Sequence, residues 1–134
     1  EAVVVSTFAN GGNLVRPWVI RSVGNRPTAV SSMRSIGWSP DALTIIRTGM
    51  REAVEHPWGT AHRAATPHIS IAGKTGTAQT SVPDRPHGWF VGFCPVEHPR
   101  VAMAIVAEHG GSGGELPASM GRAICEYVAA VEGS

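Results

Sequence analysis

The sequence predicts an α/β fold of the α+β type, an antiparallel sheet flanked by helices, and two observations carry this prediction. Three β-favouring segments follow one another closely, at residues 69–79, 88–94 and 100–108, and the connectors between them are short and contain prolines. Such connectors suit hairpins rather than the long crossovers that parallel strands need. Segments with a helical spacing of apolar residues precede and follow these strands. A chain of 134 residues is long enough for one domain core.

The N-terminal third begins with a helix pattern. Residues 2–9 have the apolar spacing of a helix interior, and Asn-Gly-Gly at 10–12 is a typical C-terminal stop. No capping residue precedes this helix, so we expect 1–134 to be the C-terminal segment of a longer domain. Residues 14–23 favour an extended strand, and residues 24–35 read as a polar loop.

The clearest helix signal starts at Pro40, with Ser39 as the N-cap and Asp41 in the first turn. The helix must end before Pro57, because the residue that precedes a proline is driven out of helical geometry. Its apolar positions keep helical spacing and are expected to face the core. They are Ala42, Ile45, Ile46, Gly49, Met50 and Ala53.

The strand at 100–108 carries an uninterrupted run of seven apolar residues, which is the pattern of a central strand. Within this chain it would nevertheless be the edge of a three-stranded meander, so it requires a partner strand from elsewhere. Because two hairpins make it parallel to the strand at 69–79, the loops after these two strands leave the sheet at the same end. A final helix is expected over 115–131. Its apolar stripe consists of Leu116, Met120, Ala123, Ile124, Tyr127 and Val131.

Composition limits the class of partner. The content of 43% hydrophobic and 16% charged residues is typical of an ordered globular chain, and a net charge of +1 from dispersed arginines does not favour nucleic acid. Seven consecutive apolar residues fall far short of the roughly 20 that a membrane helix needs, and no signal peptide is visible. Any membrane anchor is therefore expected outside this chain. Cys94 and Cys125 can pair or stay reduced, and buried free thiols are the favoured interpretation.

Other residue groups are better explained by structure than by function. The six histidines lack the tight paired spacing and the cysteine support of a zinc site, so no metal is expected. Alternating Trp89, Val91 and Phe93 favour a core beneath a helix over an aromatic shelf for a ligand. The glycine-rich loop 110–114 lacks the strand and lysine context of a phosphate-binding loop.

The candidate site is the stretch 69–79, which begins as an alternating strand and then loses bulk at Gly73 and Gly76. Glycine within a strand commonly marks a place where a ligand or another backbone comes close. Lys74 and Thr75 point to opposite faces, so both can serve one ligand only at the open edge of the strand. The natural guest of such an edge is an extended peptide. Lys74 is also the only lysine among eleven basic residues, and it supplies a compact ammonium with three donors.

Lys74-Thr75-Gly76 on a strand is a motif of penicillin-binding proteins and class A β-lactamases. Taken with its neighbours in order and spacing, it makes the whole chain resemble the C-terminal part of the transpeptidase domain of class B penicillin-binding proteins, most closely the elongation-type penicillin-binding protein 2 group. The resemblance implies the C-terminal portion of a serine transpeptidase/β-lactamase-like fold. The neighbouring motifs are Gly59-Thr60-Ala61, Ala72 to Gln79, His87 to Phe93 and Ala107 to Gly114.

That family cross-links peptidoglycan through a serine that attacks the D-Ala-D-Ala end of a stem peptide, and β-lactams acylate the same serine. By resemblance, Lys74 would set the charge and proton network of the site. Thr75, Gly76 and Thr77 would bind the stem peptide that donates the acyl group, and the two threonine hydroxyls would hold its carboxylate. The backbone N–H of Thr77 would be one of the two hydrogen-bond donors to the oxyanion. The resemblance further implies an extracytoplasmic location, no cofactor, and a membrane glycosyltransferase as a further partner.

The sequence also departs from that family. It contains neither Ser-x-x-Lys nor Ser-x-Asn, so the nucleophile and the general base are expected in an upstream part of the same protein, and the isolated segment is expected to be inactive. Two alternatives stay open. One is a serine β-lactamase, which releases the acyl group to water, and the other is a non-catalytic domain that senses penicillin.

Overall fold

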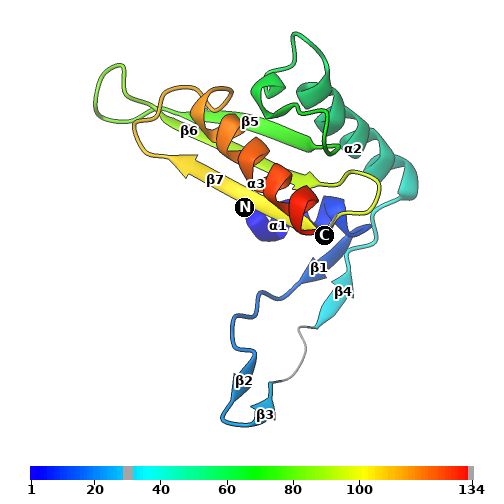
Figure 1. Ribbon diagram of the computed structural model, residues 1–134. Helices are drawn as coiled ribbons and strands as arrows, with labels where there is room; N and C mark the ends of the chain where they lie inside the picture. Colours follow the sequence, from blue (N-terminus) through cyan, green and yellow to red (C-terminus); the bar gives the residue numbers. More distant parts are fainter. Residues whose placement is uncertain (29–31, 133–134) are drawn as a thin grey trace.

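The structure, a computed structural model, describes residues 1–28 and 32–132. Its centre is a three-stranded antiparallel sheet in the order β5 (Ala72–Ala78), β6 (His87–Cys94) and β7 (Val101–Ala107). Helix α3 (Leu116–Glu132) crosses one face of this sheet, and helix α1 (Ala2–Ala9) lies on the other (Figure 1). The longer helix α2 (Pro40–Glu55) packs against β5, and a short 3-10 turn, η1 (His62–Ala64), lies between α2 and α3. The predicted α+β class and antiparallel sheet are confirmed.

The register of the sheet decides which side chains share a face. Thr75 pairs with Phe90, which in turn pairs with Ile105, so these three side chains lie on the face that α3 covers. Lys74 pairs with Val91 and therefore lies on the face of α1. The buried cluster on the α3 face comprises Val54, Ala61, Ala64, Ile71, Phe90, Cys94, Met103, Ile105, Ala118 and Cys125. The cluster on the α1 face comprises Val5, Ala9, Met50, Ala72, Phe93 and Val96.

Helix α2 has the predicted start and end. The Ser39 hydroxyl oxygen accepts the backbone N–H of Ala42 at 3.2 Å, and the helix ends at Glu55, before Pro57. Its predicted buried face was wrong in part, because the buried side chains are Leu43, Met50 and Val54, while Ile45 is 73% exposed.

Helix α3 has its predicted extent, but the apolar stripe does not face the sheet. The residues against the sheet are small, and a Cβ on Gly121 would lie 2.5 Å from the Phe90 ring. Because the helix lies this close to Phe90, larger side chains are turned away. Most of the predicted stripe is therefore exposed, namely Leu116, Met120, Ile124, Tyr127 and Val131.

Cys94 at the end of β6 and Cys125 in α3 form a disulfide, with their Cα atoms 6.1 Å apart. The expectation of buried free thiols was wrong. Both residues are buried as predicted, but the close packing of α3 on the sheet brings their side chains together. The disulfide ties the helix to the sheet.

Residues 13–28 and 32–35 form an arm that projects from the body of the molecule (Figure 1). At its base β1 (Asn13–Val15) pairs with β4 (Met33–Ser35), and further out β2 (Ser22–Val23) pairs with β3 (Arg26–Pro27). The predicted polar loop at 24–35 is therefore partly strand, although residues 29–31 lie outside the described residues. Across the described parts of the chain, no helix has the length and apolar character needed to cross a bilayer.

Candidate active site along the edge of β5

Strand β5 lies at one edge of the three-stranded sheet, with β6 as its only strand partner within the described residues. The sequence predicted this open edge, and it predicted that Lys74 and Thr75 would lie on opposite faces. The register places them so. A row of free backbone groups at such an edge can pair with an extended peptide.

Lys74 is exposed, and its ammonium donates to the carbonyl oxygen of Thr75 at 2.6 Å. It borders a hollow of about 240 Å³ on the α1 side of the sheet. The residues that line this hollow come from the chain start, β5 and β6, and they are Glu1, Lys74, Thr75, Gly76, Trp89 and Val91. The ammonium therefore borders a concave surface rather than an isolated stretch of flat strand.

The two threonines differ in exposure. Thr77 is exposed and pairs with Gly88, which has no side chain to cover the Thr77 hydroxyl. Thr75 pairs with Phe90 and is half-buried. An ammonium and two hydroxyls along one strand edge are suitable donors for a carboxylate.

The two strand glycines have different surroundings. A Cβ on Gly73 would lie 2.5 Å from the Phe90 ring, so this glycine makes room for the protein's own core. A Cβ on Gly76 would meet only Trp89 Cβ, at an ordinary 3.4 Å. The expected approach of a ligand therefore applies to Gly76 and not to Gly73.

Two loops meet at the end of β5, as the hairpin topology predicted. The backbone N–H of His109, just after β7, donates to His87 Nδ1 at 2.9 Å. The backbone N–H of Gly111 donates to the carbonyl oxygen of Pro86 at 3.3 Å. The loop before β6 and the loop after β7 therefore touch beside the candidate site.

Sequence reasoning missed Trp89 as part of this site. Phe93 and Val91 do pack beneath α1, as expected of a core, but Trp89 is half-buried and lines the hollow beside Lys74. The pairing of Gly76 with Trp89 places its ring on the Lys74 face, so the signal lay in the register, which the sequence alone does not fix. His87 and His109 were also not expected to meet, yet their ring centroids are 4.8 Å apart.

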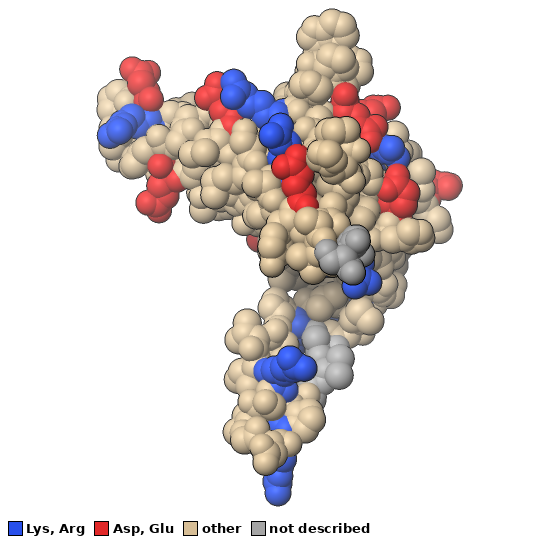
Figure 2. Space-filling model, in the orientation of Figure 1, with Lys and Arg blue, Asp and Glu red and all other residues tan. Residues whose placement is uncertain are grey.

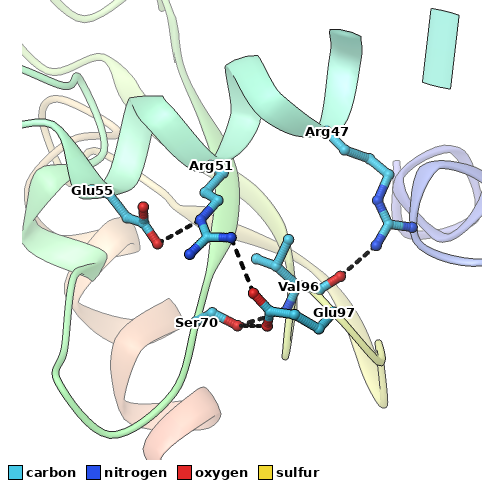
Figure 3. A network of polar contacts seen from close by, with 6 residues as sticks. All are labelled: Arg47, Arg51, Glu55, Ser70, Val96 and Glu97. Carbon is cyan, nitrogen blue, oxygen red and sulfur yellow. Dashed lines mark hydrogen bonds and ion pairs between the residues drawn. The ribbon is translucent and has the colours of Figure 1, made fainter. Parts of the chain in front are cut away.

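A second polar network joins Arg47, Arg51, Glu55, Ser70, Val96 and Glu97, near the start of β5 (Figure 3). Arg51 contacts Glu55 at 2.7 Å and Glu97 at 3.0 Å, and Ser70 donates a hydrogen bond to Glu97. The Ser70 hydrogen bond, with a smaller contribution from Arg51, lowers the pKa of Glu97 below its ordinary value. Arg47 donates to the carbonyl of Val96, so the network fastens α2 to the turn between β6 and β7.

The described residues contain no group of three or more His, Cys, Asp or Glu side chains arranged to hold a metal ion. Among the described residues that line the hollow, Glu1 alone carries a carboxylate. Lys74 and the two threonines are donors along the open edge of β5, and this arrangement supports the binding of an anionic, extended ligand.

Residues 1–126 match the family described as the penicillin binding protein transpeptidase domain. The chain is 33% identical to the peptidoglycan D,D-transpeptidase PbpA of Mycobacterium tuberculosis over 99% of its length. It is 30% identical to the peptidoglycan D,D-transpeptidase MrdA of Acinetobacter baumannii over 94% of its length. It covers 29% of the first relative and 21% of the second, so it spans less than a third of either.

Solved structures of penicillin-binding proteins match the fold of this chain. The crystal structure of PBPA from M. tuberculosis matches 93% of this chain, with a TM-score of 0.79 and 32% identity, over 32% of that protein. The imipenem acyl-enzyme complex of M. tuberculosis penicillin-binding protein A gives the same score and identity over 97% of this chain and 29% of the other. PBP2 of Pseudomonas aeruginosa, in complex with WCK 5153, matches 94% of this chain and 28% of its own, with a TM-score of 0.79 and 30% identity. The resemblance predicted from the sequence motifs is confirmed.

Proposed function

Because this chain belongs to the penicillin binding protein transpeptidase family, we propose that it forms one wall of the active site of a serine D,D-transpeptidase that cross-links peptidoglycan stem peptides. One observation carries the proposal. Lys74, Thr75, Gly76 and Thr77 lie on an edge strand whose outer edge has no strand partner within the described residues, beside a hollow that Lys74 borders. Relatives named D,D-transpeptidases and an imipenem acyl-enzyme complex support the reaction and the inhibitor class.

In the proposed reaction, the hydroxyl oxygen of an upstream serine bonds to the carbonyl carbon of the penultimate D-alanine, and the serine proton passes to an upstream base. The tetrahedral intermediate then breaks the peptide bond and releases the terminal D-alanine with a protonated amine. An amine of a neighbouring strand attacks the acyl-serine ester, forms the new peptide bond and restores the serine hydroxyl. A β-lactam would acylate the same serine through its strained amide.

The residues of this chain would act through position and charge. The Thr75 and Thr77 hydroxyls would donate to the terminal carboxylate, and Lys74 would stabilise negative charge beside them. The backbone N–H of Thr77 would donate to the oxyanion of the tetrahedral intermediate. One such preorganised donor contributes about 3 kcal/mol to a reaction of this type.

We propose that an upstream part of the same protein completes the domain, since this chain has no Ser-x-x-Lys sequence. Two surfaces support a covering by further polypeptide. Strand β7 is a sheet edge that carries seven consecutive apolar residues, and α3 exposes an apolar stripe that includes Met120, Ile124 and Tyr127.

An extracytoplasmic location is also proposed. The relatives are peptidoglycan transpeptidases, and the disulfide between Cys94 and Cys125 would persist in an oxidising compartment. We also propose a membrane glycosyltransferase as a partner of the complete protein, because the family resemblance implies one.

The test is acylation of the complete protein by a labelled penicillin, together with an assay of stem-peptide cross-linking. A stable adduct with cross-linking is expected. Rapid hydrolysis of the penicillin would instead identify a serine β-lactamase, and a stable adduct without cross-linking would identify a penicillin sensor. Absence of any adduct would overturn the proposed function.

A further inference from the structure

The loop after β7 is seated on the backbone of the candidate site. A Cβ on Gly113 would lie 2.3 Å from the carbonyl oxygen of Gly76 and 2.1 Å from that of Trp89. A Cβ on Gly114 would lie 2.5 Å from the carbonyl oxygen of Thr60. Real Cβ atoms do not approach oxygen this closely, so the loop reaches its position only because these residues are glycines.

The same loop is held at its other end by two histidines. His87 Nδ1 accepts the backbone N–H of His109 at 2.9 Å, so this nitrogen carries no proton in the contact. His109 Nδ1 lies 2.9 Å from the carbonyl oxygen of Arg85, which can only accept, so this nitrogen carries a proton. The two contacts therefore require different nitrogens to carry the proton, Nε2 in His87 and Nδ1 in His109.

The histidine contact also fixes an unfavourable backbone geometry. His109 has a φ of 54°, in the left-handed region that side chains other than glycine rarely adopt. Its N–H is bonded to His87 at the start of β6 and its ring to Arg85 in the loop before β6, and these two bonds hold the residue in that conformation. Four residues later, Gly113 touches Gly76. The path from His87 to the β5 backbone is thus a short chain of direct contacts.

We propose that His87, His109 and Gly113 are positioning residues for the acylation reaction, because they seat the loop 108–114 on Gly76 and so fix the adjacent Thr77. The inference rests on the proposed function and adds to it. A displacement of about 1 Å in a reacting geometry can lower a rate about 100-fold, so an oxyanion donor on an edge strand requires such support. The loop supplies this support by lying against the backbone of Gly76 and Trp89. The outer edge of β5 has no strand partner within the described residues.

The kinetic test compares two substitutions of His87 in the complete protein, with labelled penicillin as the probe. His87→Leu removes the acceptor for the His109 N–H, whereas His87→Asn places an amide oxygen near the position of Nδ1. We expect His87→Leu to lower the second-order acylation rate at least about tenfold, and His87→Asn to restore most of it. His98→Leu, at the opposite end of the sheet, is the matched control and should leave the rate unchanged.

The outcomes separate the two proposals. If the parent protein forms no adduct, the proposed function fails. If the parent is acylated and His87→Leu reacts at the parental rate, the positioning role is wrong. Equal slowing of the Leu and Asn variants would also overturn it, because the loss would then not follow the hydrogen bond.

A spectroscopic measurement covers the case in which His87→Leu does not fold. In the complete protein with ¹⁵N-labelled histidine at alkaline pH, the imidazole nitrogen shifts report which nitrogen carries the proton. We expect His87 protonated at Nε2 and His109 protonated at Nδ1. The reverse tautomer at His87 would remove the hydrogen bond on which the inference depends.

Discussion

Thr77 shows how one residue combines two functions in the proposed site. Its side chain is exposed, and its strand partner Gly88 leaves the hydroxyl uncovered. Its backbone follows directly on Gly76, which the loop 108–114 touches. The hydroxyl can therefore be removed by substitution while the backbone donor and its support remain in place.

We expect Thr77→Val in the complete protein to lower the rate of acylation by labelled penicillin about ten- to 100-fold, because a hydrogen bond to a charged group contributes about 1.5–3 kcal/mol. Thr44→Val is the matched control, since the exposed Thr44 hydroxyl donates to the Pro40 carbonyl within α2, away from the candidate site. A parental rate for Thr77→Val would exclude the carboxylate-binding role.

Glu97 gives a prediction about stability rather than reaction. Its pKa is lowered in the folded state, first by the Ser70 hydrogen bond. Folding therefore favours the ionised carboxylate, and its contribution to stability is complete above the ordinary value near 4.5. That contribution is lost as the pH falls through the lower, folded value.

Glu97→Gln should accordingly reduce the melting temperature slightly at neutral pH, and the difference from the parent should shrink as the pH is lowered below the ordinary carboxyl range. The effect should be small and should weaken at high salt, because the side chains of Arg51 and Glu97 are 42% and 52% exposed. A difference that stays constant with pH would contradict the role of the ionised carboxylate.

At the scale of elements, the sequence predicted what local chemistry determines. The Ser39 cap, the helix end before Pro57 and the three hairpin strands depend on neighbouring residues, and all of them are present. The face that a helix presents to a sheet depends instead on how closely the two can pack. That distance is set by Gly121 against Phe90. The small residues Ala118, Gly121 and Cys125 recur at helical spacing and face the sheet, but the prediction followed the larger apolar side chains instead.

The site follows the same division. The open edge of β5 and the opposite faces of Lys74 and Thr75 follow from strand alternation and hairpin order. Trp89 and the pairing of His87 with His109 depend on register and on the paths of two loops. Pairing of residues 31 apart, as in the disulfide, likewise requires the packed structure.

The disulfide gives a prediction for α3. In the chain-entropy model, a cross-link that closes a loop of this length stabilises the fold by about 3–4 kcal/mol. We expect reductant to lower the urea midpoint of the protein markedly. A Cys94→Ala and Cys125→Ala double variant should have a similarly low midpoint that does not respond to reductant. Identical midpoints for parent and double variant would contradict this role.

At the scale of the whole molecule, two apolar surfaces are exposed to solvent. The chain carries an apolar stripe on α3 and an apolar sheet edge at β7, neither of which is covered within the described residues. The proposal of an upstream partner segment makes a specific claim about these surfaces, namely that both are buried in the complete protein.

We therefore expect Ile124→Glu to lower the melting temperature of the complete protein by several degrees, because a buried carboxylate without a partner costs at least about 2 kcal/mol. Ser119→Glu, an exposed position on a different side of α3, should change it little. If both variants melt with the parent, the stripe is not covered and the proposed domain completion is wrong.

The charged residues are distributed unevenly between the arm and the rest of the chain. The sequence from 13 to 35, which includes the arm, contains four arginines and no acidic residue, whereas the remainder of the chain has seven basic and ten acidic residues. Figure 2 shows basic side chains along the arm with no acidic ones among them. A net charge of +1 thus conceals an excess of four positive charges at one extremity and of three negative charges elsewhere. This separation of charge makes the molecule an electric dipole. Near a charged surface, within the screening length of about 10 Å at moderate ionic strength, the dipole would orient the molecule more strongly than its net charge would attract it.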